Sequence, residues 1–540
     1  MRPIQLQAAG CWWKSWRFWL LAALAAQYAM LQIATGVEYM DAPRNLHWGI
    51  YLVEQPRFLI DAEDVYNRIA GFPPTPAALA PAGAATGHSA PLHSWWGPLY
   101  IILFGAVWWI TGSYAALRLV VPLAAGATVL LTYAFGTRYF NARVGLLAAV
   151  LLALFPIYRE HAAIAFVEPI SALLIMGALW AVLARRTGLA ALIGALTVLG
   201  KIDLIVLYFG TIIFTALISA RAPGQRLPTR HLAICVAAPL LVLLPWLYLT
   251  YVLNARPSAV AGGPRLDIFL TLAPLMLDQL FTIRPILALS LLGLFGAAAG
   301  WSLWLRKSAA PLVYRFLAVW LALGGLVMAV YTATPGASNN PRVLIPALPA
   351  LCLLAADGFD RMRPRLSRMA LCYMLALFVL LDGIGVWYQV LQARAAYSNM
   401  PAWEALRGQP RGYVLTADIW NAALYARQPV TWFDSDITFQ HNILQHLEHF
   451  QSYIASAPIR YIVLPRDEHT APAYMRSPAA QLYERLPIGR SLGWTQTEPV
   501  APEVRAFLEQ HYQEQSAGDM VIFTIDGQSG LPRAPAKYSE

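Results

Sequence analysis

Charged residues are scarce in this sequence, and the shortage is uneven along the chain. Only 13% of the 540 residues are charged, which is about half of the roughly 25% found in soluble proteins. Residues 1–390 carry 27 Lys or Arg and 14 Asp or Glu, whereas residues 391–540 carry 12 and 15. The first part is therefore too apolar to be an ordinary water-soluble globule, while the second part has the composition of a soluble domain.

Cysteines and glycine-rich motifs are also lacking, and their absence excludes further classes. The 4 cysteines are widely spaced and none follows Cys372, so the sequence holds neither a disulfide framework nor a zinc-finger spacing. It has no internal repeat and no glycine-rich loop of the kind that binds nucleotide phosphates. The basic residues are scattered between apolar runs and do not form the single patch that nucleic-acid binding requires.

Long apolar runs are abundant, and they predict a polytopic α-helical membrane protein. A helix needs about 20 apolar residues to cross a bilayer. No small-residue cleavage site closely follows the first run, which indicates a retained span and not a signal peptide. The eleven predicted spans cover residues 17–36, 114–136, 144–157, 163–184, 188–200, 203–220, 231–253, 284–304, 313–331, 342–357 and 369–390.

Arginines and lysines predict the orientation of these spans. With the N-terminus in the cytoplasm, 17 of the 27 basic residues in residues 1–390 fall on short inner loops, as the positive-inside rule expects. Eleven spans then place the tail outside. We therefore predict a bacterial inner (plasma) membrane protein with a membrane module over residues 1–390 and a periplasmic α/β domain over residues 391–540.

The tail alternates between strand-like and helix-like segments. Residues 413–415, 461–464 and 520–523 are rich in β-branched and aromatic side chains, which predicts strands. Residues 439–455 and 503–513 have helical periodicity. A small α/β domain with a loose C-terminal end follows from this pattern.

One further apolar run, Trp96 to Gly112, conflicts with the span count. If this run crossed the membrane, every later basic cluster would lie on the outer side. The run and the residue just before it carry four tryptophans, which favour the membrane interface. We predict a juxtamembrane helix that ends a large first outer loop of about residues 37–113; a short ordinary span is the alternative.

Three acids in this loop are candidates for acid–base chemistry. Asp61, Glu63 and Asp64 stand within four positions just outside the membrane. Partial burial beside like charges would suit one of these carboxylates to proton abstraction. A solvated acidic turn with Asp61 as a helix N-cap is the alternative.

Charged residues at the ends of the apolar runs are further candidates. Glu168 precedes Pro169 at the outer end of the fourth predicted span, where a plain helix start would use the same residues. Lys201 and Asp203 lie between two apolar runs, as a functional turn or as a snorkelling ion pair. Arg342 enters the tenth span from outside, as a phosphate ligand or as an interface anchor.

The tail holds one histidine group. His446 and His449 have the helical spacing of two metal ligands, and His441 lies nearby. Without a cysteine in the tail, a solvated surface is the favoured interpretation, and no metal site is predicted.

Three stretches together resemble a known superfamily. They are Leu-Ile-Asp-Ala-Glu-Asp-Val-Tyr at 59–66 with Trp-Gly-Pro-Leu-Tyr at 96–100; the segment from Leu117-Arg118 through Tyr-Phe-Asn-Ala-Arg at 139–143 to Phe-Val-Glu-Pro at 166–169; and Pro-Arg-Val-Leu-Ile-Pro-Ala-Leu-Pro-Ala-Leu at 341–351. Their order resembles that of the GT-C polytopic glycosyltransferases. The likeness is greatest to the protein mannosyltransferase-like branch (glycosyltransferase family 39), which includes the lipid A aminoarabinose transferase.

The resemblance implies an activity and assigns roles to several residues. It implies a polyprenyl-phosphate sugar donor whose head lies in a cavity under the first loop, with Asp61 as the base on the acceptor hydroxyl. The family places its tyrosine four residues after this acid, whereas here Tyr66 comes five residues after it, so Glu63 or Asp64 is an alternative base. Glu168 matches the acid of the second outer loop.

The donor-binding residues follow from the same resemblance. Arg342 and Lys201 stand where basic groups would meet the donor phosphate, and Tyr66 and Tyr100 belong to the matched motifs. Because polyprenyl phosphate is a good leaving group beside a cation, one base suffices for a direct displacement with inversion at the sugar carbon. No cofactor is required by this chemistry, although a divalent metal is compatible with the carboxylates.

The resulting hypothesis is a membrane glycosyltransferase. Its partners are a polyprenyl-phosphate-linked sugar, membrane lipids and a lipid, glycan or protein acceptor, and nucleic acid is not among them. A transporter or flippase for a lipid-linked sugar would share the span count, but such proteins place ionisable groups near mid-membrane and show paired broken helices. A non-catalytic scaffold is the third interpretation, and it would leave the acidic loop without a task.

Overall fold

The protein is described by a computed structural model that divides into two compact units. Unit 1 comprises Met1–Ala34, Arg118–Trp246 and Ser258–Val386, and unit 2 comprises Thr35–Leu117, Leu247–Pro257 and Trp387–Glu540. The structure describes residues 16–35, 46, 49–50, 52–53, 97–163, 166–220, 226–248, 296–303, 312–333, 341–362, 376, 380, 383, 400–416, 422–430, 446–456, 459–466 and 500–525.

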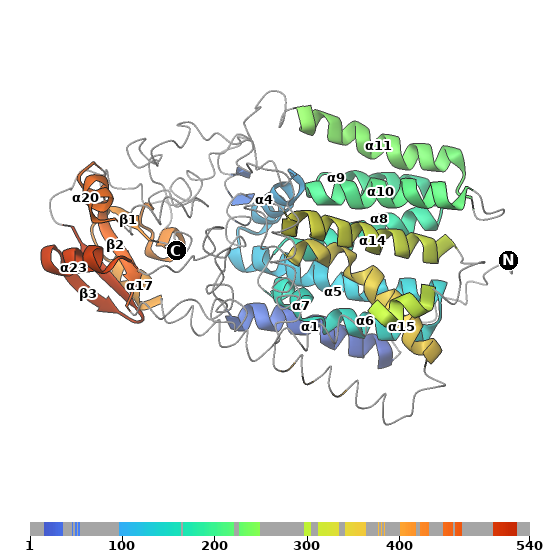
Figure 1. The fold of residues 1–540 in the computed structure, drawn as a ribbon, viewed down its shortest axis with the longest axis horizontal. Helices are drawn as coiled ribbons and strands as arrows, with labels where there is room; N and C mark the ends of the chain where they lie inside the picture. The colour runs from blue at the N-terminus through green and yellow to red at the C-terminus, as the bar shows by residue number, and fades with distance from the viewer. Residues whose placement is uncertain are drawn as a thin grey trace. The chain divides into compact units, whose positions relative to one another are not determined.

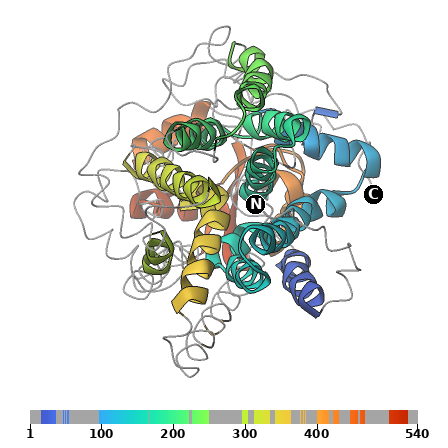
Figure 2. The same ribbon diagram turned by 90° about the vertical axis from the view of Figure 1, so that its right-hand side faces the viewer.

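Unit 1 is a bundle whose long helices run roughly side by side (Figure 1) and are seen nearly end-on in Figure 2. Its helices follow the apolar runs of the sequence, because a membrane span must satisfy its backbone polar groups internally. The bounds are α1 (Trp16–Thr35), α5 (Tyr114–Tyr139), α6 (Ala142–Ala153), α7 (Pro156–Ala163), α8 (Glu168–Leu183), α9 (Thr187–Val198), α10 (Ile202–Ser219), α11 (Thr229–Leu247), α14 (Leu312–Ala333), the 3₁₀ helix η4 (Pro341–Ala347) and α15 (Leu348–Met362).

The length and composition of these helices make the protein a multi-pass membrane protein. Among the described residues, 5 helices are long and apolar enough to cross a bilayer: α5, α10, α11, α14 and the joined η4–α15 segment. The pair α6 and α7 adds a sixth if the two count as one span. Helices α8 and α9 are shorter than the predicted spans. Most of the last predicted span, 369–390, and most of the span 284–304 lie outside the described residues.

The predicted span 144–157 differs from the structure, because the helix breaks near the C-terminal end of this span. Helix α6 ends at Ala153, and α7 begins at Pro156 with a bend of 61° between the two axes. Proline at a first helical position is favoured, whereas a proline inside a helix removes a hydrogen bond and clashes with the preceding turn. After the break, the polar sequence Arg159-Glu160-His161 belongs to the separate short helix α7.

The rod formed by η4 and α15 (Pro341–Met362) is the innermost part of the bundle. In its most apolar window 94% of the residues are buried, compared with 22% in α11. Gly324 of α14 packs against Ala347, where a Cβ atom on the glycine would overlap with the alanine. Pro341 and Pro346 lack amide hydrogens, and the chain adopts a 3₁₀ helix through this stretch before α15 begins.

Hydrogen bonds fix which helix ends meet. Asn141 caps α6: its Oδ1 accepts from the amide nitrogens of Arg143 and Val144 at 2.8 and 2.9 Å. Its Nδ2 donates to Asp360 Oδ2 at 3.1 Å. The C-terminal end of α15 therefore lies beside the α5–α6 turn, with basic residues predicted for the inner loops. The N-terminal end of the η4–α15 rod lies at the opposite end of the bundle.

Unit 2 contains the helix α4 (Leu99–Thr111) and a small mixed sheet. The predicted juxtamembrane run is thus a helix, which ends at Gly112 in a left-handed conformation (φ 56°) that glycine adopts without strain. The sheet has strand order β1–β2–β4–β3, with β1 parallel to β2 and the other pairs antiparallel. Its strands are β1 (Tyr413–Leu415), β2 (Ile459–Pro465), β3 (Gln513–Ala517) and β4 (Met520–Thr524).

The sheet confirms the three predicted strands and adds a fourth. The helices α17 (Met400–Arg407), α20 (Leu447–Ser456) and α23 (Pro502–His511) accompany it, and their buried faces contribute to a common core that includes Trp403, Phe450 and Leu508. The predicted helix 503–513 ends earlier, because the chain after His511 turns back and pairs as β3 with β4. The predicted helix 439–455 starts outside the described residues and continues as α20.

Candidate functional site

The candidate site is a buried cluster of charges where α8, α10 and η4 begin. Glu168 is the first residue of α8, with Pro169 in the first turn. Lys201 precedes α10 in an extended conformation and Asp203 lies in the first turn of that helix. Arg342 is the second residue of η4. Three separate helix starts therefore bring these four side chains together at one end of unit 1.

Glu168 is the centre of the cluster. Its Oε1 accepts a hydrogen bond from Lys201 Nζ at 3.1 Å, and Arg342 Nε lies 3.5 Å from the same oxygen. Lys201 Nζ also lies 3.9 Å from Asp203 Oδ2. Glu168 is fully buried, and Lys201 and Asp203 are each 3% exposed. The Coulomb attraction between these charges is stronger than in a surface ion pair, because charges in a low-dielectric interior are weakly screened.

The two carboxylates of the cluster are incompletely hydrogen-bonded in the part of the chain that the structure describes. Among the described residues, Glu168 Oε2 and both carboxylate oxygens of Asp203 are buried without a hydrogen-bond partner. Buried polar groups are nearly always satisfied, and an unsatisfied one calls for an explanation such as a bound ligand. The cluster therefore has the incomplete polar contacts of a binding site.

An aromatic ring supports the cationic side of the cluster. The Arg342 guanidinium carbon lies 5.0 Å from the centre of the Phe166 ring, in a cation–π arrangement. The His161 ring packs on the same phenyl ring at 4.7 Å between centroids. Phe166 therefore contacts both an arginine of η4 and a histidine of α7.

The structure brings together three of the residues predicted for the site. Glu168, Lys201 and Arg342 form one cluster, with Asp203, which the sequence also singled out. Tyr100 is buried in α4, which belongs to unit 2. Asp61, Glu63, Asp64 and Tyr66 lie outside the described residues.

Sequence reasoning missed His161. The signal that could have found it is the charged triplet Arg159-Glu160-His161 between two apolar runs. The histidines of the tail are a different matter: His446 and His449 are exposed and their rings touch edge to face at 5.2 Å, whereas His441 lies outside the described residues. In the part of the chain that the structure describes, no group of three or more His, Cys, Asp or Glu side chains could hold a metal ion.

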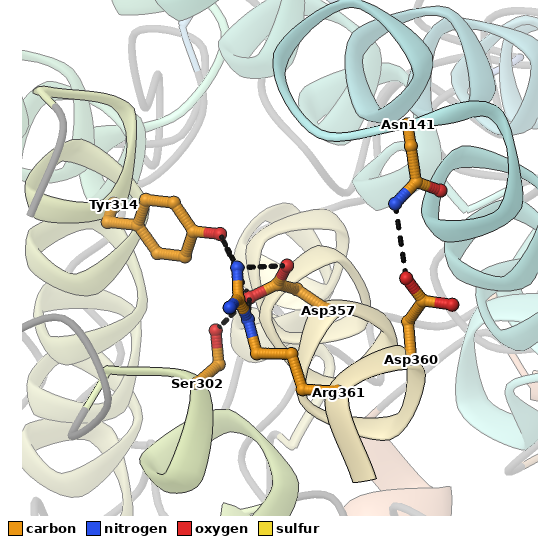
Figure 3. A network of polar contacts seen from close by, with 6 residues as sticks. All are labelled: Asn141, Ser302, Tyr314, Asp357, Asp360 and Arg361. Carbon is orange, nitrogen blue, oxygen red and sulfur yellow. Dashed lines mark hydrogen bonds and ion pairs between the residues drawn. The ribbon is translucent and has the colours of Figure 1, made fainter. Parts of the chain in front are cut away.

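A second polar cluster lies at the other end of the η4–α15 rod (Figure 3). Asp357 is 3% exposed and accepts from Ser302 Oγ at 2.5 Å and from Tyr314 OH at 2.9 Å. Arg361 donates from Nε to Asp357 Oδ2 at 2.7 Å and from Nη2 to Oδ1 at 3.2 Å. Each carboxylate oxygen of Asp357 thus has a donor, as in a structural network.

No protein-family model matches this chain, and no curated protein matches its sequence. Solved structures match it across nearly the whole length. The structure of ArnT from Cupriavidus metallidurans bound to undecaprenyl phosphate superposes with a TM-score of 0.58 at 14% identity, and the match covers 96% of this chain and 100% of that chain. The same protein in the apo state gives 0.56 at 13% identity, covering 96% and 99%.

A second neighbour comes from an archaeon. The oligosaccharyltransferase of Archaeoglobus fulgidus in the apo form has a TM-score of 0.52 at 12% identity, covering 96% of this chain and 76% of that chain. At such identities the similarity concerns the fold. The chain has the fold of the GT-C polytopic glycosyltransferases, which is the superfamily that its three sequence stretches resemble.

Proposed function

We propose that the protein is a membrane glycosyltransferase that moves a sugar from a polyprenyl-phosphate donor to an acceptor hydroxyl. The observation that carries the proposal is the buried cluster of Lys201 and Arg342 around Glu168, with carboxylate oxygens that lack hydrogen-bond donors among the described residues. Such a site can satisfy both parts of a glycosyl phosphate. Its cations match the phosphate oxygens, and its free carboxylate oxygens match sugar hydroxyls.

The charge of the cluster suits a phosphodiester. Two cations and two carboxylates sum formally to zero. The N-terminal ends of α8 and α10, which meet at the Glu168–Lys201 contact, each add about half a positive charge. The site then has an excess close to one positive charge. A singly charged diester would balance it.

The transfer itself needs one base and a stabilised leaving group. The acceptor oxygen attacks the anomeric carbon, the bond from that carbon to the phosphate oxygen breaks, and the sugar configuration inverts. Lys201 and Arg342 stabilise the charge that develops on the phosphate, an effect that is typically worth about 10²–10³-fold in rate for one donor. A first-loop acid takes the hydroxyl proton. We assign this role to Asp61, with Glu63 and Asp64 as alternatives and Glu168 as its partner.

The fold supports the lipid donor. ArnT from Cupriavidus metallidurans, whose fold this chain shares, has been captured with undecaprenyl phosphate. We extend this ligand class to the present chain, with eleven spans, a cytoplasmic N-terminus and the residues 391–540 in the periplasm of a bacterial inner membrane. In this orientation the Glu168 cluster faces the outer leaflet. The tail would then help to select the acceptor.

The test uses single amide variants of the acids. Purified protein in detergent is given a polyprenyl-phosphate sugar and an envelope-lipid acceptor, and the glycoside is followed by mass spectrometry. Asp61→Asn, Glu63→Gln, Asp64→Asn and Glu168→Gln are compared with Glu509→Gln, an exposed acid in α23. We expect the base variant to lose activity and the α23 control to keep it. Full transfer by all four site variants would refute the mechanism.

The same reaction separates this function from a transporter. A flippase or transporter would move the lipid-linked sugar across vesicle membranes without forming a glycoside. Sugar translocation without product, in vesicles that contain the wild-type chain, would favour that alternative.

A further inference from the structure

Three helix ends meet at His231, where α8 ends and α9 and α11 begin. His231 is the third residue of α11 and is 5% exposed. Its Nε2 donates to the carbonyl oxygen of Val182, in the last turn of α8, at 3.0 Å. Its Nδ1 lies 2.8 Å from the hydroxyl of Thr187, the first residue of α9. One buried side chain therefore holds the three helix ends together.

Four exposed arginines surround this junction, and we call them the arginine patch: Arg185, Arg186, Arg226 and Arg230. Arg185 Nη2 donates to the carbonyl oxygen of Arg226 at 3.5 Å, which joins the two loops that carry the patch. Within the described residues none of the four arginines forms an ion pair. The sequence from the first to the last of them contains a single acid, Asp203, in the first turn of α10. The patch therefore carries four positive charges that no nearby carboxylate in these loops balances.

The backbone of Arg185 has a conformation that favours glycine. Its φ of 56° is left-handed. The amide of Arg185 donates to the carbonyl of Val182 at 3.1 Å, and that of Arg186 donates to Ala181 at 2.9 Å. These two bonds are those of a helix C-terminus in which glycine usually follows the cap. An L side chain is strained there, so the local fold does not explain why this position carries an arginine.

Helix stability does not explain the other arginines. Arg186 is the N-cap of α9, and Arg230 lies in the first turn of α11. Cations are unfavourable at helix N-termini, because the helix dipole is positive there. The positive-inside rule counts basic residues on a loop and does not require them to gather at a junction of helices. The surface is instead complementary to an anion.

Exposed aliphatic side chains lie one helical turn below the patch. Leu189 follows Arg186 by three residues and Ile234 follows Arg230 by four, so each shares a helix face with its arginine. Leu189 is 50% exposed and Ile234 36%. Helix α11 lies at the edge of the bundle in Figures 1 and 2, and only 22% of its most apolar window is buried. A charged layer above exposed apolar surface matches a ligand with an anionic head and acyl chains.

We propose that the arginine patch binds an anionic phospholipid, whose phosphate contacts the guanidinium groups and whose acyl chains lie along α9 and α11. Guanidinium groups bind phosphate through paired, charge-assisted hydrogen bonds. In the predicted orientation this lipid belongs to the cytoplasmic leaflet, and it fastens the exposed helix α11 to α8 and α9. The inference does not rest on sugar transfer, because the patch and the Glu168 cluster lie at opposite ends of α8.

Native mass spectrometry of the full-length protein in detergent tests the proposal. The protein is titrated with phosphatidylglycerol and with phosphatidylcholine of the same acyl chains, and the bound lipid is counted. We expect phosphatidylglycerol to bind more tightly and to raise the melting temperature more. The double variant Arg186→Gln with Arg230→Gln should bind it about 25-fold more weakly, at about fivefold for each arginine. The matched double variant with lysine at both positions should retain most of the affinity.

Arg185→Gly separates lipid binding from a structural role. The glycine removes one charge and also the strain of the left-handed backbone. In lipid-free detergent its melting temperature should equal or exceed that of the wild type, whereas phosphatidylglycerol should bind about fivefold more weakly. Arg143→Gln, at an exposed position in the first turn of α6, is the charge control and should leave the lipid affinity unchanged.

Each other outcome overturns the proposal. Equal binding of the two lipids by the wild type would do so, and so would wild-type phosphatidylglycerol affinity in the glutamine double variant. A lower melting temperature of Arg185→Gly with unchanged lipid affinity would assign the arginine a structural role. If glycerol phosphate, which has no acyl chains, raised the melting temperature as much as phosphatidylglycerol, the ligand would be a soluble anion. A failure of the transferase assay would leave these lipid measurements unaffected.

Discussion

The η4–α15 rod carries a buried polar cluster at each end, and the two clusters differ in how completely they are satisfied. At its C-terminal end both oxygens of Asp357 are bonded, with donors from Ser302, Tyr314 and Arg361. At its N-terminal end Glu168 uses one oxygen for two cations, while its second oxygen has no partner among the described residues. The same helix therefore ends once in a complete network and once in an incomplete one.

This difference indicates two kinds of role. A fully hydrogen-bonded buried carboxylate gains no further bond from a ligand, and any change to it should mainly affect stability. An unsatisfied buried carboxylate raises the energy of the empty state, and a ligand that supplies donors recovers that energy on binding. Burial and charge alone do not distinguish the two ends of the rod. They differ in how many carboxylate oxygens have a hydrogen-bond donor among the described residues.

The largest effect is expected at Asp357. Asp357→Ala removes the acceptor of all three neighbours and leaves the Arg361 guanidinium without its carboxylate, which costs about 3–5 kcal/mol of unfolding free energy. Denaturant or thermal unfolding in detergent measures this loss, and the folded fraction should keep its polyprenyl phosphate affinity. The double variant Asp357→Leu with Arg361→Met should recover much of the stability. A weaker lipid affinity in folded Asp357→Ala protein would contradict the division of roles.

Lys201 should show the opposite behaviour. Lys201→Met removes a cation that contacts Glu168 and should lower kcat/KM for sugar transfer by about 10²–10³-fold. Because Arg342 still pairs with Glu168, the melting temperature should fall less than in Asp357→Ala. Lys201→Arg is the control that keeps the charge, and it should retain part of the activity. Wild-type transfer by Lys201→Met would remove the cluster from the mechanism.

Much of the membrane part could be predicted, because hydropathy and positive charge are local signals. Apolar runs in the sequence correctly predicted the positions of the helices α1, α5, α8, α9, α10, α11, α14 and α15. Arg342 and Lys201 could be predicted as candidate site residues, because both depart from the positive-inside pattern. Their joint contact with Glu168 could not be predicted, because it arises from the packing of helices far apart in the sequence.

Two elements that the sequence did not predict have different physical origins. The strand Gln513–Ala517 has a polar, mostly exposed sequence without a strand pattern, and it forms because β4 offers a free edge with which it pairs. The bend at Pro156 separates the polar helix α7 from the apolar run before it, and His161 lies in this polar helix. At β3 a tertiary contact decided a conformation that the local sequence left open, whereas at Pro156 the local signal for a break was present in the proline itself.

Phe166 should show a smaller effect, confined to the incomplete end. Phe166→Leu keeps an apolar side chain but removes the ring face under the Arg342 guanidinium, a contact worth about 1–2 kcal/mol when it is desolvated. We expect the KM for the donor to rise roughly 5- to 30-fold, with a small change in kcat. Steady-state kinetics with varied donor measure the split. Phe166→Tyr should be close to wild type, and an equal loss in both variants would mean that packing, not the ring face, matters.

The smallest effect should come from Asn141 at the complete end. Asn141→Ala removes the cap of α6, whose two amide hydrogen bonds come from Arg143 and Val144, and a lost cap costs about 1 kcal/mol. Asn141→Ser cannot supply the amide donor that reaches Asp360. It keeps a capping oxygen, however, so its loss of stability should be smaller than that of Asn141→Ala. Differential scanning calorimetry measures both changes in stability, and the transfer kinetics of the folded protein should match those of the wild type. If Asn141→Ala altered donor KM, the two ends of the rod would be coupled and the contrast between them would no longer separate structure from function.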